Sequence, residues 1–209
     1  MKLVARWNSK DGFKADKAVG RINNQEKLAR IAVEARSYWA REAAVEKLTA
    51  EDHQTLLAHI ATTDQHWFVR ELAIEKLTPA DYQPLLAEIA TKDCDKHVRR
   101  AAVEKLVAEE NQSLLVEIAT KDKDPWVCET ALKQLISANN RSLPKEIIAM
   151  YGKGLNGKSE YDRDHYAHLL RFIYEKVDAP LKEQIASFNG IIIQEELRFP
   201  EPSDVNLPN

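Results

Sequence analysis

The sequence has no glycine between residues 21 and 151, although six glycines occur among its 209 residues. Glycine destabilises the interior of a helix, and this stretch is rich instead in alanine, leucine, glutamate and lysine, which are strong helix formers. Such a composition favours helices joined by tight turns. We therefore expect an all-α fold, and the hydrophobic fraction of 44% is large enough to form a substantial core.

Cysteine and long apolar runs are also scarce. The two cysteines, Cys94 and Cys128, are too few for a disulfide framework and lack the spacing of a zinc site. No purely aliphatic run exceeds three residues, as at residues 191–193, which is far shorter than a membrane span. Charged residues follow the first methionine too soon for a signal peptide. We therefore expect a cytoplasmic protein without a membrane segment.

A strong excess of basic charge is absent as well. Lysine and arginine together number 30, and aspartate and glutamate 33, so the formal net charge is −3. The small total conceals an asymmetry, because residues 1–35 carry +4 whereas residues 36–122 carry −5. A protein that clamps nucleic acid needs a basic track to contact the phosphates. We therefore do not expect nucleic acid as the partner of the acidic middle of this chain.

A repeat of 29 residues organises the chain. Within each unit, two segments carry apolar residues at helical spacing, so each unit is predicted to be a pair of short helices. A pair this short cannot bury its apolar side alone, so stacking of neighbouring units must create the core. An earlier, degenerate copy at residues 18–32 has a turn three residues shorter. The other copies of the first segment are residues 41–48, 70–77, 99–106 and, more weakly, 128–135.

Proline and aspartate indicate where the helices begin. Pro84 is compatible with the first turn of a helix but not with its interior, so Asp81 is predicted to cap that helix after a turn at residues 78–80. The first helix of each unit is predicted to start directly after an aspartate, whose carboxylate suits exposed N–H groups. These aspartates are Asp64, Asp93 and Asp122.

A short helical pair with aspartate before its first helix and Val-Arg in the first turn resembles the HEAT-repeat family, over about residues 13–151. The short period is most similar to the bacterial HEAT-like repeats that also occur in phycobilin lyases. This resemblance implies a right-handed α-solenoid of about five helical pairs, with an aspartate–arginine ladder along the stack. Here the ladder would pair Asp64 with Arg70 and Asp93 with Arg99, and would also include Arg41.

The predicted ladder is interrupted at both ends. Ala35 stands at the aspartate position of the first unit, and Cys128 stands at the arginine position of the last. A free cysteine packs as a small apolar residue when it is buried. We therefore interpret Cys128 as a packed substitute in a structural position rather than as a reactive thiol.

Residues 152–209 depart from the repeat. Glycines at positions 152, 154 and 157 break the pattern, and residues 161–177 are then predicted to form one amphipathic helix. A shorter helix is predicted at residues 180–188, and a loose tail from residue 199. We expect this region to be a C-terminal helical cap, which belongs to the same domain as the solenoid of residues 1–151.

The sequence offers no pattern typical of catalysis. None of its six histidines is followed by glutamate, so the His-Glu pairs of the HEAT-like deoxyhypusine hydroxylases are absent. His165 and His168 could share a helix face with Asp162 or Asp164, but a lone pair of this kind is typical of a solvated helix. There is no phosphate-binding glycine loop and no nucleophile elbow. We therefore predict no catalytic residue, no cofactor, no metal site and no enzymatic activity.

Two neighbouring repeat positions carry aromatic residues. The first position is occupied by Trp39, Phe68, His97 and Trp126. Aromatic residues at one repeat position usually pack between stacked units, and we interpret this column in that way. The preceding position is more variable, so we expect its members Tyr38 and Trp67 to be exposed. Because large aromatics often dominate the energetics of interfaces, Trp67 with His66 is the predicted anchor for a partner.

A column of polar residues follows the second helices, which normally line the concave face of such a solenoid. The column grades from basic to acidic, so it could select a partner by charge complementarity. An ordinary solvated helix surface remains the alternative. The column consists of Arg30, His59, Glu88 and Glu117.

These features favour a non-catalytic scaffold for protein–protein interactions, because a solenoid offers an extended surface and the sequence offers no chemistry. We expect a monomer that binds a protein partner of unknown identity. Two other classes stay open, namely a phycobilin-lyase-type enzyme or accessory protein and a nucleic-acid-binding repeat protein. The candidate partner-binding residues are Arg30, His59, Glu88, Glu117, His66 and Trp67.

Overall fold

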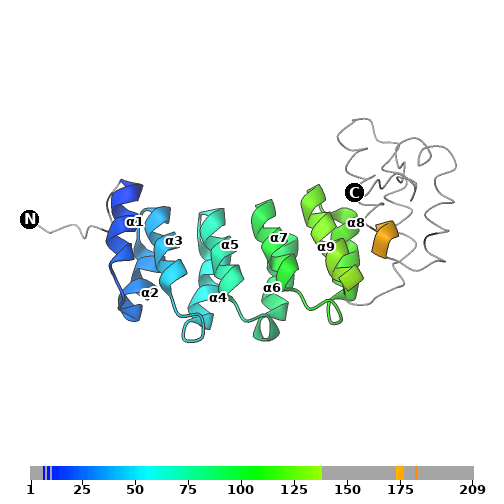
Figure 1. Ribbon diagram of the computed structural model, residues 1–209, viewed down its shortest axis with the longest axis horizontal. Helices are drawn as coiled ribbons and strands as arrows, with labels where there is room; N and C mark the ends of the chain where they lie inside the picture. The colour runs from blue at the N-terminus through cyan, green and yellow to red at the C-terminus, as the bar shows by residue number, and fades with distance from the viewer. Residues whose placement is uncertain (1–6, 8, 10, 138–172, 177–181, 183–209) are drawn as a thin grey trace, which may run out of the picture.

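The computed structural model describes residues 7, 9, 11–137, 173–176 and 182 (Figure 1). This part of the chain is helical and contains no strand, so the predicted all-α class is confirmed. A 3-10 helix, η2 (Pro79–Asp81), precedes α6. The α-helices are α1 (Gly12–Gly20), α2 (Gln25–Glu34), α3 (Tyr38–Lys47), α4 (Gln54–Thr63), α5 (Trp67–Lys76), α6 (Gln83–Lys92), α7 (Lys96–Lys105), α8 (Gln112–Lys121) and α9 (Pro125–Ser137).

The helices form a row of antiparallel pairs, which makes the chain an α-solenoid (Figure 1). The odd-numbered helices from α1 to α9 pack side by side in one layer. Each even-numbered helix packs most closely against the odd-numbered helix that follows it, as α4 packs against α5. Three residues join α4 to α5, whereas six join α3 to α4, and short connections favour antiparallel neighbours. The closest pairs in the structure are thus α4 with α5 and α6 with α7. The sequence repeat instead predicts α5 paired with α6.

The hydrophobic core runs along the whole stack. Leucine and isoleucine from the even-numbered helices meet valine and alanine from the odd-numbered helices. Small side chains such as Ala43 and Ala44 in α3 let neighbouring helices approach closely. Full burial of one leucine contributes about 1.5–3 kcal/mol, so the repeated positions supply most of the driving force for stacking. The fully buried leucines at the equivalent position of each repeat are Leu28, Leu57, Leu86 and Leu115.

A ladder of buried ion pairs joins consecutive repeats, but its register differs from the predicted one. Arg70 donates from Nε and Nη2 to the two carboxylate oxygens of Asp93, at 2.8 Å each. The predicted pairing of Arg70 with the carboxylate of Asp64 is wrong, because Arg70 donates instead to the backbone carbonyl of Asp64, at 2.8 Å. The same two-pronged contact joins Arg41 to Asp64 and Arg99 to Asp122.

Each ladder arginine thereby connects two repeats. Besides the carboxylate ahead of it, the arginine binds a carbonyl at the end of the preceding even-numbered helix, where carbonyls lack partners within the helix. For Arg99 this carbonyl belongs to Asp93, at 3.1 Å, so the predicted pairing of Arg99 with the Asp93 carboxylate is also wrong. At the end of the ladder, the thiol of Cys128 replaces the guanidinium and donates to the carbonyl of Asp122 at 3.4 Å.

The ladder aspartates end helices rather than start them. The C-caps of α4, α6 and α8 are Asp64, Asp93 and Asp122. Each carboxylate accepts the N–H two residues ahead, as Asp93 does from Asp95 at 2.8 Å. This local turn delays the next helix to the third residue after the aspartate. The predicted N-cap Asp81 is likewise wrong, because it lies in η2 and Tyr82 precedes α6.

Glutamine side chains fasten α2, α4 and α6 to the loop of the next repeat. Gln83, the first residue of α6, donates to the carbonyls of Pro79 (2.8 Å) and Lys105 (3.1 Å). Its Oε1 accepts from the backbone N–H of Val107 and from the side-chain amide of Asn111, both at 2.8 Å. Without Gln83, the backbone N–H of Val107 and the carbonyl of Lys105 would lose this partner in a part-buried place. The equivalent residues of the earlier repeats are Gln25 and Gln54.

A third polar contact joins the odd-numbered helices to one another. The lysine in the last turn of each helix donates to a carbonyl near the end of the previous odd-numbered helix, where such carbonyls lack helical partners. In α9 a glutamine takes the place of the lysine and makes the same contact. The pairs are Lys76 with Glu46 (2.8 Å), Lys105 with Glu75 (2.7 Å) and Gln134 with Glu104 (2.9 Å).

The ends of the solenoid follow the sequence only in part. The loop between α1 and α2 is shorter than the later equivalent loops, as the degenerate first unit predicts. Of the predicted helix at 161–177, residues 173–176 are helical, and Ile173 is buried in the core. The helix predicted at 180–188 (residue 182 apart) and the tail from 199 lie outside the described residues. Within the described residues, no helix has the length and apolar character needed to cross a bilayer.

Candidate partner-binding surface

An aromatic row runs along the N-terminal ends of α3, α5 and α7. The ring of Tyr38 lies parallel to that of His66, with centroids 3.8 Å apart. The indole of Trp67 stacks on the imidazole of His97 at 4.8 Å. The rings of His66 and Trp67 are 6.0 Å apart, so the row continues across three repeats. His66 and Trp67, the predicted anchor, are therefore the middle of a stack that joins repeats.

The structure reverses the predicted roles of the two aromatic positions. Tyr38 and Trp67, expected to be exposed, are half-buried and pack against the core. In contrast, the exposed fractions are 48% for Trp39, 37% for Phe68 and 49% for Trp126. Helix geometry explains the reversal, because Trp67 lies one turn before the buried Arg70, whereas Phe68 lies one turn before Glu71 on the outer side.

Helix α1 closes the N-terminal end of this surface. Gly12 lies so close to the indole of Trp39 that no Cβ would fit between them. The neighbouring ring of Phe13 is exposed, and the ammonium group of Lys17 lies 4.3 Å from its centroid. The chain thus already places a cation over a surface aromatic at this end of the stack.

Each exposed aromatic of α3 and α5 has a glutamate one turn further along its helix. We call the surface formed by Trp39, Glu42, Phe68 and Glu71 the aromatic–carboxylate face. Both glutamates are half-buried, and neither forms a hydrogen bond or an ion pair within the described part of the chain. Burial raises the pKa of Glu42, and the nearby carboxylates of Asp16 and Glu46 raise it further. Burial likewise raises the pKa of Glu71.

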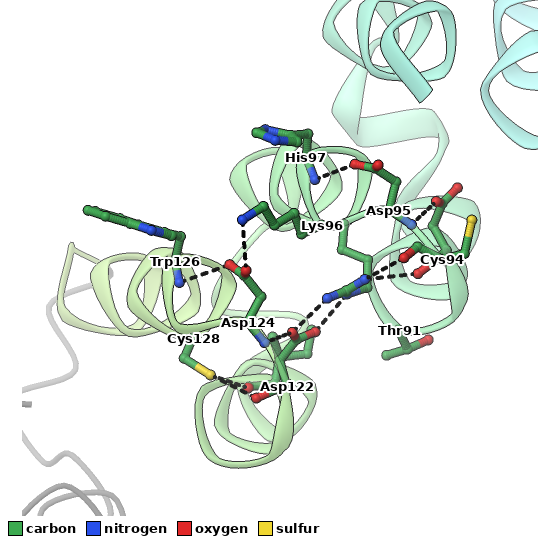
Figure 2. Close-up of polar contacts among 12 residues, drawn as sticks. Thr91, Cys94, Asp95, Lys96, His97, Asp122, Asp124, Trp126 and Cys128 are labelled. Carbon is green, nitrogen blue, oxygen red and sulfur yellow. Dashed lines mark hydrogen bonds and ion pairs between the residues drawn. The ribbon is translucent and has the colours of Figure 1, made fainter. Parts of the chain in front are cut away.

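Toward α7 and α9, the carboxylate of this surface is paired with a cation (Figure 2). The ammonium group of Lys96 lies 3.3 Å from the carboxylate of Asp124, which also accepts the backbone N–H of Trp126 at 3.1 Å. Carboxylates at this end therefore have partners, unlike those of the aromatic–carboxylate face. A small pocket here is lined by Lys96, His97, Arg100, Asp124 and Trp126.

The predicted column on the second helices consists of exposed side chains that are engaged in local contacts. Three of its members form ion pairs within their own helices, and exposed pairs of this kind contribute only about 0.3–0.5 kcal/mol. The imidazole of His59 lies 3.4 Å from the hydroxyl of Thr63. His59 and Glu117 line two different pockets, so the column is not gathered into one site. The ion pairs are Arg30–Glu34 (2.8 Å), Glu88–Lys92 (3.0 Å) and Glu117–Lys121 (3.1 Å).

The two cysteines have different surroundings. Cys94 is exposed, and Nη2 of Arg70 lies 3.8 Å from its sulfur. Cys128 is buried, and burial raises the pKa of its thiol to about 12. The thiol of Cys128 is therefore protonated at neutral pH and is a poor nucleophile. This agrees with its interpretation as a packed substitute at the arginine position.

The described residues contain no group of three or more potential metal ligands among histidine, cysteine, aspartate and glutamate. The pair His165 and His168, with Asp162 and Asp164, lies outside the residues that the structure describes. Nδ1 of His66 is buried without a hydrogen-bond partner in the described part, and the imidazole ring stacks on Tyr38 in the aromatic row. The part of the surface described here is therefore one of aromatic rings and charged side chains.

Comparison with known proteins supports the architecture. No protein-family model matches the sequence, and no curated protein sequence matches it. Among solved structures, YibA of Escherichia coli is similar, with a TM-score of 0.58 and 18% identity over 93% of this chain and 74% of YibA. The chain is a helical repeat protein. A designed armadillo repeat protein also matches, with a TM-score of 0.42 and 17% identity over 94% of this chain and 91% of the design.

Sequence reasoning missed Glu42 and Glu71 as candidate site residues. Their signal is present in the sequence, because each follows an aromatic residue by three positions and the two lie 29 residues apart. This spacing identifies a surface site only once the exposed side of α3 and α5 is known. The finer resemblance to the short repeats of phycobilin lyases stays a prediction.

Proposed function

We propose that this protein is a non-catalytic scaffold that binds a protein partner on the layer of odd-numbered helices. The observation that carries this proposal is the set of three large, exposed aromatic side chains at one repeat position, Trp39, Phe68 and Trp126. Exposed aromatics on a rigid support are typical hot spots of protein interfaces, because they bury a large area with little loss of conformational freedom.

The support for these side chains is rigid in three ways. Three kinds of contact connect one repeat to the next, namely buried arginine–aspartate pairs, glutamine hydrogen bonds to loops, and lysine hydrogen bonds to carbonyls of the previous odd-numbered helix. The row from Tyr38 to His97 provides a packed base directly behind the exposed rings. A preorganised surface loses less entropy on binding than a flexible one, which favours recognition of an extended partner.

The second-helix column of Arg30, His59, Glu88 and Glu117 is the alternative docking surface within the same function. Its local ion pairs cost little to break, so a partner with complementary charges could replace them. The two surfaces lie on different layers of helices, and one experiment can therefore separate them.

The test is affinity capture with purified, tagged protein, followed by mass-spectrometric identification and a binding titration with the purified partner. We expect W39A/F68A to weaken binding by at least about 30-fold, because each buried aromatic anchor contributes on the order of 1–2 kcal/mol. The matched variant R30A/H59A/E88A/E117A should bind within about twofold of the wild type, as expected for exposed side chains that the partner does not contact.

Circular dichroism must show that both variants are folded. Loss of binding in the four-alanine variant alone would contradict the proposed surface and assign the interface to the second helices. Turnover of a substrate, visible absorbance after mixing with a bilin, or a salt-sensitive mobility shift with nucleic acid would contradict the scaffold function itself.

A further inference from the structure

Glu42 and Glu71 are placed where a carboxylate is costly. Both are half-buried, and neither has a hydrogen-bond or ion-pair partner among the described residues. Removing a carboxylate from water is unfavourable unless a positive or hydrogen-bonding group compensates it. Asp16 and Glu46 add repulsion at Glu42. At Glu71 burial is the main cause of the raised pKa, and repulsion by Glu75 is opposed by attraction to His97 and Arg100 of the next repeat. The free protein therefore leaves the charge of Glu42 without a compensating cation and the charge of Glu71 only partly compensated.

The adjacent aromatic rings select the same kind of ligand as the carboxylates. The exposed parts of the Trp39 and Phe68 rings can attract cations through their π-electrons, and tryptophan does so most strongly. Lys17 over the ring of Phe13 shows that this surface accommodates an ammonium group on an aromatic ring. A cation placed near Trp39 would also lie within one helical turn of Glu42.

The spacing of the two halves of the face fits an extended peptide. Helices α3 and α5 pack side by side, and packed helices lie about 8–10 Å apart. A chain in the extended polyproline II conformation has three residues per turn and advances about 3.1 Å per residue, so positions i and i+3 lie about 9 Å apart on the same side. Two basic residues at positions i and i+3 of an extended segment would therefore reach equivalent places on consecutive repeats.

We propose that the aromatic–carboxylate face binds an extended, basic segment of a protein partner, with lysine or arginine at every third position. This inference rests on the proposed scaffold function and names the chemistry of its partner. The charge of the surface supports it, because an acidic segment would meet Glu42 and Glu71 without a compensating cation. The face ends at α7, where Arg100 stands at the repeat position of Glu71 and reverses the sign.

The experiment uses the full chain and a fluorescein-labelled peptide of twelve residues, in which arginine at every third position is separated by glycine and serine. Fluorescence anisotropy should show binding that weakens with added salt. The variant E42Q/E71Q should bind about fivefold to tenfold more weakly, because the two ion pairs with the peptide are lost. A peptide with glutamate in place of arginine should not bind.

The matched control is E88Q/E117Q, which removes the same charge from side chains paired with Lys92 and Lys121 on the other layer. It should change peptide affinity by less than about twofold. Equal loss of affinity in both double variants would show attraction by net charge alone and would overturn the proposal. Unchanged affinity in E42Q/E71Q would overturn it as well.

A thermal melt keeps these results interpretable. A carboxyl group whose pKa is raised by folding destabilises the folded state once the pH exceeds its unfolded pKa, and this penalty is absent when the group is protonated. E42Q/E71Q should therefore melt at or above the wild-type temperature at pH 7, and the difference should vanish at acidic pH.

The outcome for the two proposals can be distinguished. If the arginine peptide does not bind while W39A/F68A still abolishes binding of the natural partner, only the basic-segment proposal is overturned and the scaffold function stands.

Discussion

Arg99→Met should lower the free energy of unfolding by about 3–5 kcal/mol, because it leaves a buried carboxylate without its cation. The side chains of Arg99 and Asp122 expose only 3% and 9% of their area, and two hydrogen bonds of 2.8 Å join them. The arginine also supplies the hydrogen bond to the carbonyl of Asp93. Urea unfolding followed by circular dichroism measures this loss of free energy. In a separate thermal melt, the melting temperature should fall by about 10 °C.

The neighbouring Arg100 provides the matched control for this variant. Arg100 is partly exposed, and its guanidinium lies 3.7 Å from Glu104 in the same helix. Arg100→Met removes the same charge from the same helix and should cost less than about 0.5 kcal/mol. Similar losses in the two variants would show that the ladder contributes no more than a surface ion pair.

Gln83→Ala should destabilise the solenoid by about 2–3 kcal/mol. The substitution removes a buried side chain that binds the carbonyl of Pro79 in η2. The same side chain binds one carbonyl and two donors between the end of α7 and the start of α8. A buried polar group left without a partner costs about 1–3 kcal/mol, and part of this cost is recovered where water can enter. The loss is measured in the same urea experiment.

Gln112 occupies the equivalent position of the next repeat and is exposed. No hydrogen bond of its side chain occurs within the described residues. Gln112→Ala should therefore change the free energy of unfolding by less than about 0.5 kcal/mol. A loss at Gln112 as large as that at Gln83 would contradict the assignment of this contact to repeat stacking.

The repeat period and the buried positions could be predicted from the sequence because both depend on local apolar spacing. Leu57, Leu86 and Leu115 recur every 29 residues, and all three are fully buried. The position of Pro84 in the first turn of α6 follows from the chemistry of proline alone. Such features need no knowledge of how one repeat sits on the next.

The register of the ladder depends on tertiary structure and was therefore predicted wrongly. Asp93 lies six residues before Arg99 in sequence, which makes a local pair attractive. In the structure, Asp93 folds back on its own loop and faces Arg70 of the preceding repeat. A 29-residue repeat offers each arginine an equivalent aspartate on either side, and only the stacking of the repeats decides between them.

The aromatic columns show the same limit for the candidate site. Trp67 and Phe68 are adjacent in sequence, so an error of one residue in the start of α5 exchanges the buried and the exposed side. The predicted start directly after Asp64 places the helix two residues too early. The sequence prediction takes the more variable position as the exposed one, but Trp67 stacks on His97 of the next repeat, a contact that only the stacked structure shows.

The most direct test of scaffold function is site-specific photo-crosslinking from Phe68, an exposed aromatic of the aromatic–carboxylate face. Phe68→p-benzoylphenylalanine should form a covalent adduct with one identified protein partner after irradiation. The same substitution at Glu88, on the other layer of helices, should not form this adduct. An adduct formed from position 88 but not from position 68 would contradict the proposed binding surface, and the absence of a protein adduct from either position would contradict the scaffold function.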